Sequence, residues 1–76
     1  TIVYDNEPRN IDIVKSIDKV IDLGYSVCIW PDNMEQKDIN DMIRAGMSSK
    51  DIQRLIDQHT YKDLSAKMRL TQWKRI

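Results

Sequence analysis

The sequence predicts an α/β fold, a β-α-β unit with parallel strands followed by short helices. Residues 2–4 and 25–30 are short apolar segments with the composition of strands. Between them lies an amphipathic segment that is bounded by Asn10 and Gly24. A strand, a helix and a second strand in this order are typical of a right-handed crossover within one sheet.

The helix between the two strands is predicted from its apolar spacing. Its apolar residues recur at i, i+1, i+4, i+7 and i+8, which places one stripe on a helix surface. These residues are Ile13, Val14, Ile17, Val20 and Ile21. Asn10 is a suitable N-cap, because its side-chain oxygen can accept from the first free backbone N–H groups. Gly24 suits a C′ position with positive φ, so the helix should stop at Leu23.

The second strand is predicted to lie inside a sheet. Val27, Cys28, Ile29 and Trp30 form an unbroken apolar run, which indicates burial on both faces, as in parallel sheets. Pro31 should end the strand because it has no N–H for a ladder. Two strands do not make a stable two-sided sheet, so we expect further strands from before Thr1 or from another copy.

The rest of the chain is predicted to form helices near residues 38–45, 49–58 and 62–70. Each begins with a segment that resembles a capping box, with Asp in place of Glu or Gln. The three segments are Asp38-x-x-Asp41, Ser48-x-x-Asp51 and Thr60-x-x-Asp63. Gly46 should close the first of these helices.

Composition narrows the class of protein. The formal net charge is zero, from 12 basic and 12 acidic residues, but the acids lie mostly before residue 61 and the cations dominate after it. The single cysteine, Cys28, excludes an internal disulfide and a zinc site made of several cysteines, and favours a reducing cytoplasm. No apolar stretch of about 18 residues occurs, so neither a membrane span nor membrane association is expected.

Acidic side chains follow both predicted strands. Asp5 and Glu7 come after the first, and carboxyl ends of parallel strands meet at one edge of a sheet, where α/β proteins bind ligands. Mg²⁺ prefers oxygen ligands and commonly uses one or two carboxylates together with water. The loop after the second strand adds Asp32, Glu35, Asp38 and Asp41. The alternative is that these acids only favour turns and helix starts.

The basic C-terminal segment leaves three interpretations open. Cations and apolar residues alternate in it, and its candidate contact residues are Lys67, Arg69, Trp73, Lys74 and Arg75. They could bind nucleic-acid phosphates with a stacking tryptophan, or dock on a partner protein. Alternatively Met68, Leu70 and Trp73 pack back on the body and the cations stay in solvent.

Three segments resemble a known family. Residues 2–9 (IVYDNEPR), 37–44 (KDINDMIR) and 66–70 (AKMRL) resemble the closing third of the Toprim-type DNA primases of T-even-like bacteriophages. The resemblance runs in order over essentially the whole chain. It implies a partial Toprim fold, with residues 1–60 as the C-terminal half of a Toprim catalytic domain and residues 61–76 as its basic helical tail.

The resemblance also implies site residues. Asp5 and Glu7 match the Toprim D-x-D pair, with Glu in the second place, and Asp38 matches a further acid; all three are the expected catalytic and Mg²⁺ ligands, with Mn²⁺ as a substitute. Arg9 and Lys37 are expected to contact substrate phosphates. The first Toprim glutamate and the zinc-binding module of these primases would precede Thr1. We therefore expect no zinc in this segment and no activity from it alone.

For the intact protein, the resemblance implies synthesis of short RNA primers from nucleoside triphosphates on single-stranded DNA, in the cytoplasm of the infected bacterium. The replicative helicase is the implied partner, and a homodimer through the truncated sheet edge is a further expectation. Two other functions remain open. One is an interaction module that binds helicase or DNA through its basic tail, and the other is a Toprim nuclease.

Overall fold

Two short strands lie side by side at the centre of the molecule. The computed structural model describes residues 1–76, and in it β1 (Ile2–Val3) pairs in parallel with β2 (Val27–Cys28). Ile2 lies opposite Val27 and Val3 opposite Cys28. Helix α1 (Ile11–Asp22) connects them, which confirms the predicted β-α-β unit. Both strands are shorter than predicted, because regular pairing covers only two residues of each.

The ends of α1 are set by the residues that the sequence indicated. The Asn10 side chain accepts from the backbone N–H of Asp12 at 3.0 Å and of Ile13 at 3.3 Å. At the other end Leu23 is the C-cap and Gly24 has φ of 88°, a conformation that costs glycine little. The predicted apolar stripe faces inward. Its buried members are Val14, Ile17 and Ile21.

A third strand was not predicted. β3 (Thr60–Tyr61) pairs antiparallel with β2, so β2 is the middle strand in the order β1-β2-β3. The expectation that further strands come from before Thr1 or from another copy is therefore wrong for the second neighbour of β2, which lies later in the same chain. The capping box predicted at Thr60 is also wrong. Its hydroxyl donates to the Ile56 carbonyl at 2.7 Å, and the next helix starts from Lys62 without a side-chain cap.

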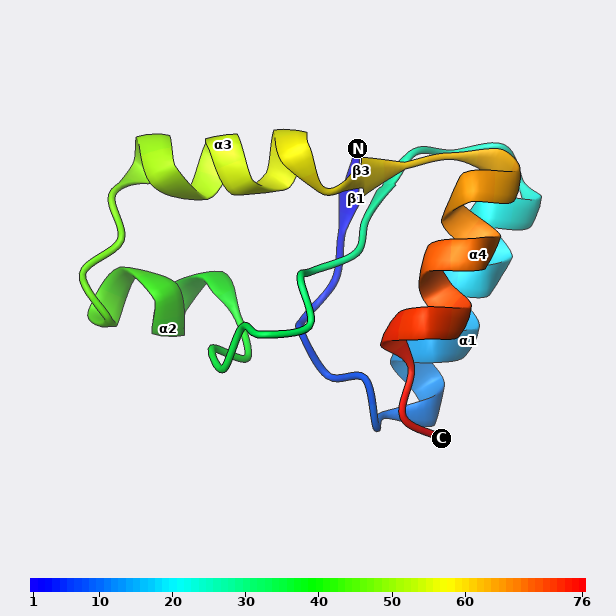
Figure 1. Ribbon diagram of the computed structural model, residues 1–76, viewed down its shortest axis with the longest axis horizontal. Coiled ribbons are helices and arrows are strands. Elements are labelled where there is room, and N and C mark those ends of the chain that lie inside the picture. The colour runs from blue at the N-terminus through cyan, green and yellow to red at the C-terminus, as the bar shows by residue number, and fades with distance from the viewer.

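Helices cover both faces of the sheet (Figure 1). On one face α1 packs with α4 (Asp63–Trp73), and on the other lie α2 (Ile39–Arg44) and α3 (Ser49–Gln58). Successive side chains of residues 27–30 point to opposite faces of the sheet, as in any extended strand, and so pack in alternation against the two helical layers. Val27 and Ile29 join the α1/α4 cluster, whereas Cys28 and Trp30 join the α2/α3 cluster. The predicted burial on both faces is confirmed, and the molecule is an α/β domain with a small mixed sheet.

The short helices begin largely as predicted. The Asp38 carboxylate accepts from the Asp41 N–H at 2.8 Å and caps α2. Ser48 and Asp51 form a reciprocal capping box at the start of α3, whose bounds match the prediction. Gly46, with φ of 100°, follows α2.

The C-terminal helix packs on the body. α4 reaches Trp73, three residues further than predicted, and buries Ala66, Leu70 and Trp73 against α1 and the sheet. Met68 differs from the packing alternative, since it remains 60% exposed. Burying a side chain such as Leu70 stabilises the fold by about 1.5–3 kcal/mol. None of the helices combines the length and apolar character that a membrane crossing requires.

Candidate functional site

The segments that follow β1 and β2 are joined by hydrogen bonds. The Trp30 indole N–H donates to the Tyr4 carbonyl at 2.8 Å, so the two strand ends are held together. Further along, the backbone N–H of Asn6 donates to the Lys37 carbonyl. The acids after β1 and those before α2 therefore belong to one region of the surface.

Lys37 lies among three of the predicted site residues. Its ammonium is 3.3 Å from Glu7 Oε1. The hydrogen bond to Glu7 raises the Lys37 pKa most, the charge of Glu7 adds to this, and Asp5 and Asp38 contribute smaller charge effects. The three carboxylates thus act on one cation. The Lys37 side chain is 58% exposed, so water screens its attraction to the three carboxylates.

The three carboxylates differ in how many hydrogen bonds and ion pairs they already make within the chain. Asp5 is exposed, and its side chain makes no hydrogen bond or ion pair. Glu7 is partly buried, at 27% exposure, and one of its oxygens faces Lys37. One oxygen of Asp38 accepts from the Asp41 N–H. No group of three or more His, Cys, Asp or Glu side chains converges on a point that could hold a metal ion.

The remaining acids of the second loop are placed elsewhere. Asp32 lies 3.2 Å from Arg69 and 3.8 Å from Arg75, so it faces α4. Glu35 and Asp41 make no side-chain hydrogen bonds or ion pairs, and Glu35 lines a cavity beside Trp73. Arg9, the other predicted phosphate contact, is exposed.

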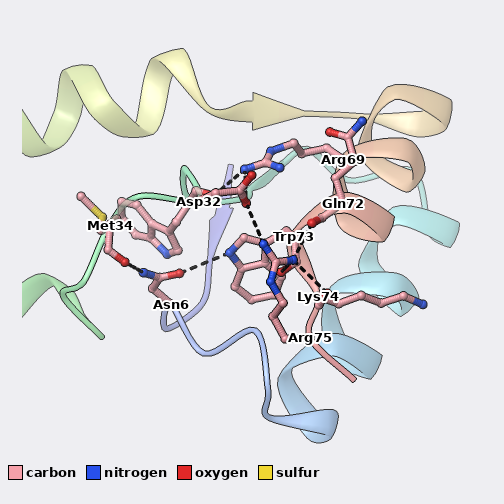
Figure 2. Close-up of polar contacts among 9 residues, drawn as sticks. Asn6, Asp32, Met34, Arg69, Gln72, Trp73, Lys74 and Arg75 are labelled. Carbon is pink, nitrogen blue, oxygen red and sulfur yellow. Dashed lines mark hydrogen bonds and ion pairs between the residues drawn. The ribbon is translucent and has the colours of Figure 1, made fainter.

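Asn6 is a residue of this region that sequence reasoning missed. Its side-chain NH₂ donates to the carbonyls of Met34 and Gln36, each at 3.0 Å. Its oxygen accepts from the Trp73 indole N–H at 3.2 Å, and Figure 2 shows this contact and the one to Met34. An asparagine between two acids reads as ordinary turn chemistry, and its partners lie 28 to 67 residues away in the chain. Nothing local in the sequence indicates them.

The end of α4 is also fixed to this region. The Arg75 backbone N–H donates to the Pro8 carbonyl at 2.7 Å. Its guanidinium donates to the carbonyls of Gln72, Trp73 and Lys74, groups that a helix end leaves without partners. A cavity of about 230 Å³ lies between these segments. It is lined by Asn6, Pro8, Pro31, Asp32, Met34, Glu35, Trp73 and Arg75.

The predicted contact residues of the tail occupy different environments. Lys67 pairs with Asp18 and with Asp22 of α1, the latter at 2.7 Å. Arg69 is only 13% exposed at its side chain and donates to the Trp30 carbonyl at 2.9 Å. Trp73 is 2% exposed, whereas Lys74 is exposed and has no ion pair. A contact with nucleic acid or a partner stays a prediction for this set.

Comparison with known proteins confirms the resemblance. The chain is similar to the DNA primase of Enterobacteria phage T4, with 38% identity over 76 residues that cover 97% of this chain. It spans only about a fifth of that relative, since the match covers 22% of its length. No known protein-family signature matches the chain.

Proposed function

We propose that this chain is part of a phage DNA primase, and that the intact protein synthesises short RNA primers on single-stranded DNA. The observation that carries the proposal is the similarity to the T4 DNA primase, at 38% identity over 97% of the chain. The fold is compatible with a partial Toprim domain, because parallel strands deliver their following loops to one edge of the sheet. A nucleotidyl transfer from nucleoside triphosphates is the corresponding reaction.

The donor set around Lys37 fits a hard divalent cation held by few protein ligands. Mg²⁺ commonly takes one or two carboxylates and keeps several waters, so a cluster of three converging acids is not required. Asp5 has both oxygens available, Glu7 has one that does not face Lys37, and Asp38 has one beyond its helix cap. Asp5 and Glu7 would hold Mg²⁺ or Mn²⁺, and Asp38 would be a further ligand through the oxygen that does not cap α2.

The chain's own residues have distinct tasks in this reaction. Mg²⁺ bound there would neutralise the triphosphate and stabilise the attacking and leaving oxygens. Arg9 and Lys37 supply positive charge beside the acids, and Arg9 makes no ion pair within the chain, so it is free to meet a phosphate. The resemblance implies a further Toprim glutamate before Thr1, so this segment alone should be inactive.

The partners follow from the same assignment. Single-stranded DNA and nucleoside triphosphates are the substrates, the replicative helicase is the protein partner, and the infected cell's cytoplasm is the location. β1 pairs with β2 on one side only, so its other edge can accept a strand from elsewhere in the intact protein or from a second copy. A homodimer through that edge is part of the proposal.

Charge-neutral substitutions in the intact protein test the metal assignment. Asp5→Asn and Glu7→Gln should each lower primer synthesis at least about a hundredfold, since each removes a ligand charge worth several kcal/mol in the transition state. Asp57→Asn on α3 is the matched control, because Asp57 is exposed and its hydrogen bond from Gln53 survives as an amide contact. Equal activity of the site variants and the control would refute the assignment.

A DNA-cleavage assay and a binding assay separate the two other functions. A Toprim nuclease would cut DNA in a metal-dependent way without nucleoside triphosphates, whereas a primase requires them. An interaction module would lose helicase or DNA binding when the exposed Lys74 is replaced by Gln, with no effect of Asp5→Asn. The internal pairing of Lys67 and Arg69 leaves fewer tail cations for that role, so the primase is the function we favour.

A further inference from the structure

We propose that Asn6 is a positioning residue, which ties the last turn of α4 to the loop between β2 and α2 and so sets the spacing of the carboxylates around Lys37. Its consequence for metal binding rests on the proposed function. The tie itself rests only on the contacts that Asn6 makes.

The Asn6 side chain uses all of its donors on one loop. Both hydrogens of its NH₂ group are spent, one on the Met34 carbonyl and one on the Gln36 carbonyl, and its oxygen accepts from the Trp73 indole. These partners fix which end of the amide is which, because two carbonyls need a donor and an indole N–H needs an acceptor. An aspartate of the same shape could keep the indole contact but not the two loop contacts.

Asn6 stands between Asp5 and Glu7 in the chain, so its position constrains both. Its backbone N–H donates to the Lys37 carbonyl, the residue next to Asp38. Asn6 therefore holds the segment of Asp5 and Glu7 against the segment of Lys37 and Asp38. A change in the Asn6 contacts would move these groups relative to each other.

The helix side of the tie is rigidly anchored. The Trp73 ring is 2% exposed and belongs to the α1/α4 core. Two residues later the Arg75 N–H donates to the Pro8 carbonyl, on the same segment as Asn6. The beginning of the second loop is held as well, because Arg69 donates to the Trp30 carbonyl and pairs with Asp32 (Figure 2). Both loops are therefore fastened to α4.

Hydrogen exchange of the intact protein, followed by mass spectrometry, tests the tie. In Asn6→Ala, the Met34 amide should exchange about tenfold faster, because its bond to the Pro31 carbonyl lies within the loop that loses both Asn6 contacts. Asn10→Ala is the matched control: it removes the N-cap of α1, four residues away, without touching the loop. Trp73→Phe removes the indole donor together with one ring of a buried side chain, and should speed exchange in the last turn of α4 and in residues 5–9.

Mn²⁺ binding, measured by the electron paramagnetic resonance signal of the free ion, tests the positioning role. Asn6→Ala should weaken Mn²⁺ binding by at least about tenfold, as loss of a residue that orients metal ligands does, whereas Asn10→Ala should leave it unchanged. In primer synthesis the same variant should need more Mg²⁺ for half-maximal rate while its rate at saturating Mg²⁺ falls less.

The outcomes are separable. If the Met34 amide exchanges alike in Asn6→Ala and Asn10→Ala, the tie is refuted. If exchange rises but Mn²⁺ affinity does not fall, the positioning role is refuted. If Asp5→Asn binds Mn²⁺ as tightly as the unmodified protein, the proposed metal function fails, and exchange alone then decides whether Asn6 fastens the loop to α4.

Discussion

Replacing Met42 by alanine should destabilise the layer formed by α2 and α3. Met42 is 0% exposed and belongs to a cluster with only three other buried residues: Cys28, Trp30 and Ile52. Truncations of buried Met, Leu or Ile to Ala cost about 2–5 kcal/mol, depending on how far the site collapses. Partly buried neighbours such as Met34 and Met47 can move in, so we expect a loss of about 3 kcal/mol, between those limits.

That loss is large for a domain of this size. At about 0.05–0.15 kcal/mol per residue, the whole fold is stable by roughly 4–11 kcal/mol. Urea unfolding followed by tryptophan fluorescence measures the change, because Trp30 lies in the same cluster as Met42 and Trp73 lies in the other. Met68→Ala is the control: at 60% exposure it should change stability by no more than about 0.5 kcal/mol. Equal losses in the two variants would refute the assignment of Met42 to a closed core.

Three further predictions concern single residues. Burial raises the pKa of the Cys28 thiol from 9.0 to about 12, so a disulfide reagent at pH 8 should label it only after unfolding, and stability should fall as pH rises above 9.0, where only the unfolded thiol ionises. Rapid labelling of the folded protein would contradict this. Gly24→Ala should cost about 1–2 kcal/mol in urea unfolding, because φ is 88° and an added Cβ would meet no neighbour, which leaves backbone strain as the sole cause; an unchanged midpoint would count against it. Hydrogen bonds from Ser48 hold the Asp51 pKa below 3.8. Their contribution to stability is therefore full above pH 3.8 and is lost as pH falls through the lowered pKa. Asp51→Asn should make stability fall less steeply in acid, and an unchanged acid dependence would show that the capping box is not its cause.

The parts of the fold that could be predicted are those fixed by local chemistry. Helix α1 was predicted from its apolar spacing, from the Asn10 cap and from Gly24, each of which acts within a few residues. The Ser48 capping box is equally local, and α3 has the predicted bounds. The parallel pairing of β1 with β2 followed from the order of elements, since a helix crossover joins parallel strands.

β3 could not be predicted because its pairing is not local. Two residues give no alternation to detect, and Thr60 followed by Asp63 imitates a helix start. The strand is selected by β2, whose middle position requires hydrogen-bond partners on both sides. The candidate site divides in the same way. The acids after β1 could be named from the sequence, but the contacts that Asn6 makes with Met34, Gln36 and Trp73 exist only in the folded chain.

The alternation along residues 27–30, which are β2 and the two residues after it, separates two nearly distinct cores. Odd-numbered Val27 and Ile29 serve one compartment, and even-numbered Cys28 and Trp30 serve the other. A shift of pairing by a single position would therefore place Trp30 in the α1/α4 cluster and Ile29 in the α2/α3 cluster, so that neither side chain would fit. Any movement of the loops that leave this strand would likewise be transmitted to both helical layers together.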